Sequence, residues 1–155
     1  GCSLAASTVA YLAKNAEYVT AIKEASGDIS HVADIMYACD GAIDLYSGND
    51  DQIVPILSLG GKGVISVLSN VAPKETHDIV ALFLEGKIKE SRELQLKALP
   101  LVHALFSEVN PIPVKAALNL MGKEVGPLRL PLTEMEAAHQ EVLVEEMKKF
   151  GIKLA

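Results

Sequence analysis

From about residue 18 onward, segments with the apolar pattern of a β-strand alternate with segments that have the apolar spacing of a helix. Short apolar or β-branched runs at Tyr18–Lys23, Ile43–Ser47 and Gly63–Val67 are each followed by a small polar turn and then by helical spacing. Strand, turn and helix recur at intervals of roughly 20 to 25 residues, which is typical of βαβ units in a parallel sheet. The pattern therefore predicts three βα units.

Helix boundaries within these units carry recognisable signals. Asp28 is a candidate N-cap for a helix with Ile29, Val32 and Met36 on one face. Pro73 suits the first turn of the third helix, and Gly86 suits its end. A helix over residues 7–14 precedes the first strand.

The strands stop after residue 86, and the rest of the chain reads as helical. We divide the chain into βα units over 1–86 and a helical C-terminal region over 87–155. That region is predicted to contain a long helix, a rigid turn, a short helix, a loop and a last helix opened by a Thr133–Glu136 capping box; these span residues 88–106, 110–113, 114–121, 122–132 and 133–150.

Three parallel strands leave both edges of a sheet unpaired. A complete (β/α)8 barrel needs about 250 residues, and this chain has 155. Two folds remain open: a small open sheet, or the C-terminal part of a TIM barrel whose earlier strands lie elsewhere. Because the first residue is Gly rather than Met, we expect a fragment of something longer.

Composition narrows the classes of function. Half of the residues are apolar, which excludes a disordered chain, and the longest stretch without a charge, residues 1–13, is too short to cross a membrane. The net charge is −6 and no basic cluster is present, which argues against a nucleic-acid surface. Cys2 and Cys39 form no C-x-x-C pair, so we expect reduced, partly buried thiols.

Lys23 is the strongest candidate for chemistry because it ends an otherwise apolar strand. Burial there would lower the pKa of its amine and make it able to attack a carbonyl carbon. The competing interpretation is an ordinary lysine whose amine reaches solvent. Its position favours the first, since the C-terminal ends of parallel strands form the mouth where ligands bind.

Gly48 and Ile65 end the next two strands at corresponding places. Glycine there lets a ligand approach the backbone, although a tight turn would explain it equally well, and Ile65 alone would be read as a core residue. Weaker signals have structural explanations: the four histidines lack metal-ligand spacing, and Gly60–Gly63 lacks the remaining residues of a phosphate loop. Asp50–Asp51 looks like a helix start, and Ser66 lacks the context of a nucleophile elbow.

Several segments in register resemble one enzyme family. The string around Lys23 resembles the Schiff-base segment of the 4-hydroxy-tetrahydrodipicolinate synthase (dihydrodipicolinate synthase) family. The later motifs of that family look similar to further segments here, in the same order, so that the resemblance covers essentially the whole chain. The matching segments are Ala21–Asp28, Tyr46–Asp50, Gly60–Ser66, Asn110–Lys115 and Leu128–Leu132.

The resemblance implies the C-terminal part of a TIM barrel and a pyruvate-dependent lyase of lysine and diaminopimelate biosynthesis. Lys23 would form a Schiff base with pyruvate, with Ile65 and Gly48 lining the pyruvate site. The enamine would attack L-aspartate 4-semialdehyde, with no metal or organic cofactor. A cytoplasmic homotetramer is implied as well.

The same resemblance implies what is missing. The proton-relay tyrosine, its neighbouring threonine and the arginine that receives the semialdehyde would precede Gly1, so we expect the isolated chain to be inactive without the N-terminal half of the barrel. Tyr46 lies on a strand that the family does not use for the relay. Alternatives are another pyruvate aldolase, such as N-acetylneuraminate lyase or a keto-deoxy-sugar aldolase, and a non-catalytic half-barrel.

Overall fold

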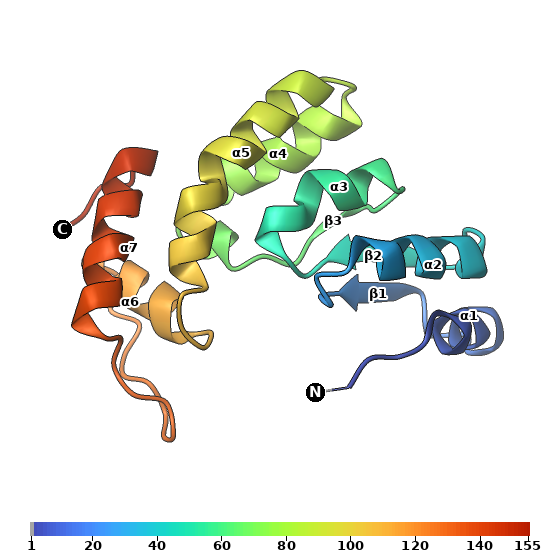
Figure 1. Ribbon diagram of the computed structural model, residues 1–155, viewed down its shortest axis with the longest axis horizontal. Helices are drawn as coiled ribbons and strands as arrows, with labels where there is room; N and C mark the ends of the chain where they lie inside the picture. Colours follow the sequence, from blue (N-terminus) through green and yellow to red (C-terminus); the bar gives the residue numbers. More distant parts are fainter. Residues whose placement is uncertain (1) are drawn as a thin grey trace.

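The computed structural model describes residues 2–155, which form an α/β arrangement of a small parallel sheet and seven α-helices (Figure 1). Strands and helices alternate in the first part, and helices alone follow. In chain order the elements are α1 (Ala6–Asn15), β1 (Ala21–Glu24), α2 (Ile29–Cys39), β2 (Asp44–Ser47), the 3-10 helix η1 (Asp50–Gln52), α3 (Ile53–Ser58), β3 (Gly63–Val64), the 3-10 helix η2 (Leu68–Asn70), α4 (Pro73–Leu84), α5 (Ile88–Leu105), α6 (Ile112–Leu120) and α7 (Ala137–Phe150).

The three strands pair in sequence order, β1-β2-β3, and all run parallel. Lys23 pairs with Tyr46, and Tyr46 pairs with Gly63, so one row of residues crosses the sheet. Parallel neighbours need a crossover connection, which α2 and α3 provide. The predicted order of βα units is therefore confirmed.

One face of this sheet is covered and the other is open. Leu45 is fully buried in an apolar cluster with residues of α1, α2 and α3, including Val9, Ile35 and Ile56. The side chains that alternate with the covered ones, at Lys23 and Asp44, are exposed. Side chains alternate between the faces of a strand, so the exposed set lies on the face that the helices do not cover.

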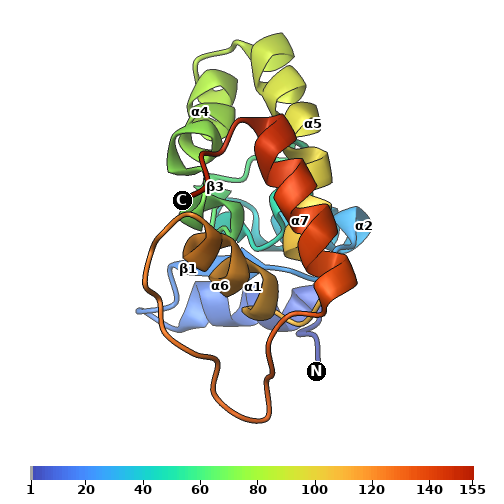
Figure 2. The ribbon, with the colours of Figure 1, turned by 90° about the vertical axis from the view of Figure 1, so that its left-hand side faces the viewer.

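A second apolar cluster holds the C-terminal helices together. It joins α5, α6 and α7 through buried residues such as Leu101, Leu105 and Leu143, and it includes Leu68 of η2. In Figure 1, α4 and α5 lie side by side as a hairpin above the sheet, and α6 and α7 lie to the left of the sheet. The long loop between α6 and α7 extends away from the helices, as Figure 2 also shows. The proposed division of the chain at residue 86 stays a prediction.

Two predicted strand boundaries are wrong. β1 begins at Ala21 rather than Tyr18, which is 89% exposed and therefore gains little from burial in the sheet. β3 ends at Val64 rather than Val67, because the amide of Val67 donates to the Asp50 carboxylate instead of continuing the ladder.

The predicted start of the last helix is also wrong. α7 begins at Ala137, and Glu136 occupies the N-cap position without a side-chain capping bond. The carboxylate of Glu108 accepts the Glu136 amide and contacts His139 Nδ1 at 2.8 Å, so a distant residue, rather than Thr133, satisfies this end of the helix. By contrast, the N-cap prediction at Asp28 is confirmed, since its carboxylate accepts the Ser30 and His31 amides.

Within residues 2–155, no helix is both long and apolar enough to cross a membrane. Cys39 is buried and Cys2 is exposed, and both thiols are free.

Candidate active site at the strand ends

The C-terminal ends of the three strands lie next to one another and bring the predicted residues into one region. The Gly48 amide donates to the Glu24 carbonyl at 2.6 Å, and the Ile65 amide donates to the Ser47 carbonyl at 2.8 Å. The ends of β1, β2 and β3 are thus joined by backbone hydrogen bonds on either side of β2. Lys23, Gly48 and Ile65 all lie at the C-terminal ends of the strands, as their sequence positions predict.

Lys23 is exposed, so the burial predicted for its side chain is wrong for this chain. It points to the open face of the sheet, where the neighbours in its row are Tyr46 and Gly63. Among the described residues its amine has no hydrogen-bond or ion-pair partner. An amine on an open face at a strand end is accessible to a small carbonyl compound.

Gly48 packs directly against Lys23. A Cβ atom built on Gly48 would lie 2.7 Å from Lys23 Cε, 2.5 Å from Ala25 Cβ and 3.1 Å from the Glu24 carbonyl oxygen. Atoms in ordinary contact are about 3.5 to 4.0 Å apart. Glycine is therefore required here by close approach, and the group it makes room for is the aliphatic stem of Lys23.

Ile65 is not a core residue, because 51% of its surface is exposed. It follows the last residue of β3, and its main chain is fixed by the bond from its amide to Ser47. Its side chain and backbone thus remain available at the same edge as Lys23.

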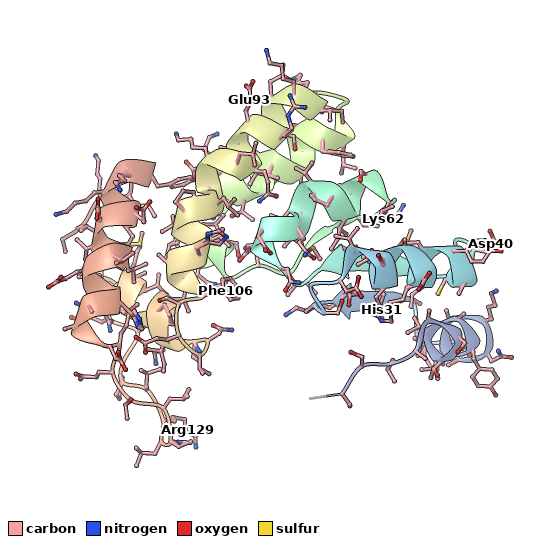
Figure 3. The ribbon with its side chains drawn as sticks, in the orientation of Figure 1. His31, Asp40, Lys62, Glu93, Phe106 and Arg129 are labelled. Atoms are coloured by element: carbon pink, nitrogen blue, oxygen red, sulfur yellow. The ribbon has the colours of Figure 1, made fainter. Side chains whose placement is uncertain are left out.

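A cavity of about 360 Å³ adjoins Lys23 on the side of α2 and the N-terminal segment. Glu24, Ser26, His31 and Cys2 are among its lining residues, whereas Gly48 and Ile65 are not. Figure 3 shows His31 on α2, close to the end of β1. Lys23 therefore lies between this cavity and the strand ends at which Gly48 and Ile65 are located.

Lys115, the other lysine in a family motif, has a different environment. It lies on α6 and lines a cavity of about 850 Å³ beneath the loop between α6 and α7. Its amine donates to the Pro127 carbonyl at 2.6 Å, which holds that loop. Arg129 lies at the far end of the same loop, away from the strand ends (Figure 3).

Sequence reasoning missed the residues that tie the strand-end loops together. Asp50 was predicted as a helix start, and it does open η1, but its side chain is 1% exposed and accepts the Val67 and Leu68 amides. Gln52 donates to the Gly27 carbonyl at 2.8 Å. The available signal was an acidic residue two positions after the strand-end glycine Gly48.

The geometry gives no indication of a metal centre in the described part of the chain. Residues 2–155 contain no group of three His, Cys, Asp or Glu side chains placed to hold an ion. His139 instead pairs with Glu108, and its hydrogen bond lowers the pKa of that carboxyl. Gly60, Gly61 and Lys62 lie in the turn between α3 and β3, as predicted, and Gly63 begins the strand.

Comparison with known proteins supports the resemblance seen in the sequence. The model of the dihydrodipicolinate synthetase family matches residues 1–150. The 4-hydroxy-tetrahydrodipicolinate synthase of Lachnoclostridium phytofermentans is 60% identical over 152 residues, which are 98% of this chain and 52% of that protein.

Solved structures agree. The dihydrodipicolinate synthase of Cyanidioschyzon merolae, with lysine bound, superposes with a TM-score of 0.94 at 39% identity, over 99% of this chain and 52% of its own. That of Acinetobacter baumannii, complexed with pyruvate, gives a TM-score of 0.92 at 34% identity, over 97% of this chain and 52% of its own. The chain thus spans about half the length of these relatives, and it belongs to the dihydrodipicolinate synthetase family.

Proposed function

We propose that the chain supplies the Schiff-base lysine and part of the pyruvate site of a 4-hydroxy-tetrahydrodipicolinate synthase. The observation that carries the proposal is Lys23, an unpaired amine at a parallel strand end whose stem packs against Gly48. The pyruvate complex of the Acinetobacter baumannii relative supports pyruvate as the first substrate.

In the proposed reaction, the neutral Lys23 amine attacks the keto carbon of pyruvate, and loss of water gives an iminium. The iminium draws electrons from the methyl group, which loses a proton to give an enamine. The enamine carbon attacks the aldehyde of L-aspartate 4-semialdehyde, and attack by the substrate amine on the iminium carbon closes the ring and releases Lys23. The iminium is itself the electron sink, so we propose no metal or organic cofactor.

The proposed architecture is the C-terminal part of a TIM barrel. The open face of the sheet and its two unpaired edges, at β1 and β3, are what such a part would present, and the relatives are about twice as long as this chain. We propose that the N-terminal half of the barrel covers this face, narrows access to Lys23 and supplies the groups that transfer protons. A homotetramer in the cytoplasm completes the proposal.

Borohydride trapping tests the lysine assignment. The full-length product of the gene that encodes this chain is treated with pyruvate and borohydride, and the labelled peptide is identified by mass spectrometry. We expect the label on Lys23, its loss in Lys23→Ala, and an unchanged label in Lys62→Ala, a matched control at an exposed lysine beside the opposite end of the sheet (Figure 3). A label on Lys115, or none on Lys23, would overturn the assignment.

The aldehyde that accepts the enamine is tested separately. Turnover with pyruvate and aspartate semialdehyde, and none in the cleavage of N-acetylneuraminate or keto-deoxy sugars, is expected. The reverse result would assign the chain to another pyruvate aldolase, and no trapping at all would favour a non-catalytic half-barrel.

A further inference from the structure

The loop that follows β2, residues 48–52, is bonded to the strand-end loops on both sides of it. On one side, Gln52 Nε2 donates to the Gly27 carbonyl at 2.8 Å, in the turn after β1. On the other side, Asp50 Oδ2 accepts the amides of Val67 and Leu68, each at 2.9 Å, in the segment after β3. The central loop thus connects the ends of all three strands.

Asp50 is itself fixed by a side chain of α5. Gln95 of α5, which is 4% exposed, donates its Nε2 to the Asp50 carbonyl at 2.8 Å, and its Oε1 accepts the Val54 amide at 3.3 Å. Both ends of this side-chain amide are used, so the position of Asp50 is set by a buried residue 45 positions away.

A buried carboxylate is costly unless hydrogen bonds compensate it. Burial raises the pKa of Asp50, and hydrogen bonds from the Leu68 and Val67 amides oppose that rise. An apolar side chain would fill the same volume without this cost. The carboxylate must therefore do something other than pack. Here it accepts two backbone amides of the chain that follows β3.

That segment begins with Ile65. Its amide donates to the Ser47 carbonyl, and β3 has ended one residue earlier. After Ile65 the main chain leaves the sheet. The Asp50 carboxylate then holds it at Val67 and Leu68, and the Ser69 amide and hydroxyl donate to the Ser66 hydroxyl and carbonyl oxygens. Ile65 thus lies between its own bond to Ser47 and the bonds of Asp50 to Val67 and Leu68, and loss of the Asp50 carboxylate would loosen the chain next to Ile65.

We propose that Asp50 is a positioning residue, whose carboxylate holds residues 65–68 so that Ile65 keeps its place beside Lys23. The inference rests on the proposed function, in which Ile65 lines the pyruvate site. Asp50 acts through the main chain of the next loop and not by touching the substrate.

The test measures the pyruvate concentration that gives half-maximal borohydride trapping at Lys23 in the full-length protein. Asp50→Ala removes the acceptor, and we expect the half-saturating concentration to rise by about 10- to 100-fold, since a small displacement near reacting groups has effects of this size. Asp50→Asn keeps one oxygen that can accept both amides, and it should stay close to the wild type. This contrast separates the hydrogen bonds from the charge.

A matched control removes a buried hydrogen bond away from the site. Ser91 is fully buried, and its hydroxyl donates to the Ile79 carbonyl at 2.6 Å between α5 and α4. Ser91→Ala should lower the unfolding temperature while leaving the half-saturating pyruvate concentration unchanged. If Asp50→Ala behaves like Ser91→Ala, Asp50 is merely structural and the inference is overturned.

The remaining outcomes are also decisive. If Asp50→Ala does not fold, Asp50→Asn still decides, because a large rise in half-saturating pyruvate in that variant would contradict positioning through amide hydrogen bonds. If the wild-type protein is not labelled at Lys23, the proposed function fails first. Labelling of the wild type, together with unaltered pyruvate dependence in Asp50→Ala, would remove only the role of Asp50.

Discussion

Replacing Gly48 by alanine should damage both folding and chemistry at the strand ends, and the two effects can be separated. The added Cβ would lie 2.5 Å from Ala25 Cβ and 2.7 Å from Lys23 Cε. Against an ordinary contact of about 3.5 Å, each approach is too short by about 1 Å. Ala25 Cβ is attached directly to the main chain and cannot move alone, whereas Lys23 Cε is near the end of a flexible side chain.

These two contacts predict different costs. The clash with Ala25 requires a backbone shift, and such overpacking costs about 1–3 kcal/mol of stability. The clash with Lys23 is relieved by rotating its side chain, which moves the amine, and a misplacement of about 1 Å near a reacting atom slows a reaction by about 100-fold. We therefore expect Gly48→Ala to lower the unfolding temperature and to slow pyruvate trapping at Lys23.

The assay combines thermal unfolding with the rate of borohydride trapping in the full-length protein. In the double variant Gly48→Ala/Ala25→Gly, the contact at 2.5 Å disappears, whereas those with Lys23 Cε and with the Glu24 carbonyl oxygen, at 3.1 Å, remain. Stability should therefore recover in part while trapping stays slow. Gly63→Ala is the matched control, because its Cβ would lie 3.4 Å from Tyr46 Cδ1, an ordinary contact. Wild-type stability and trapping in Gly48→Ala would refute the reasoning.

Four further predictions concern other parts of the molecule. Ile65→Val should retain measurable turnover, and Ile65→Ala should weaken the pyruvate dependence more; near-complete loss in both would point to a different role. Because burial raises the pKa of Asp50, its folded form binds a proton more tightly than the unfolded chain, so its contribution to stability falls as the pH rises above about 4. Urea unfolding at several pH values should show that Asp50→Asn removes this fall, and an unchanged pH dependence would contradict it. The pKa of Glu108 is instead lowered by the hydrogen bond from His139, so its contribution is present above about pH 4.5 and is lost as the pH falls further; Glu108→Gln should be less stable than the wild type at pH 6 and equal to it in acid. The isolated chain should associate or stay loosely packed and show no turnover until the N-terminal half is added in trans, and a cooperative, active monomer of 155 residues would contradict this.

Local patterns predict the elements of this chain well. The N-cap at Asp28 and the proline at the start of α4 depend on residues next to them, and both helices begin where those residues indicate. Lys23, Gly48 and Ile65 are placed at one edge by strand order alone. Their common placement follows from the parallel register, which the strand–helix alternation implies.

Long-range bonds explain where the sequence was insufficient. The early end of β3 depends on Asp50, 17 residues before Val67, and the start of α7 depends on Glu108, 28 residues before Glu136. No local pattern reveals such partners. The exposure of Lys23 was missed for a related reason. The burial of a strand residue depends on what covers its face of the sheet, and no element within residues 2–155 covers the face that carries Lys23.

The two free edges of the sheet decide how copies of this chain would behave on their own. β1 of one copy and β3 of another are both parallel edge strands, so they can pair head to tail and leave the same two edges free for the next copy. Ring closure would stop this growth only at a permitted strand number, and an eight-stranded barrel is not a multiple of three strands. A heterologous contact that does not close continues into open polymers. Production of this segment without a complementary partner therefore favours filaments or aggregates over a defined oligomer.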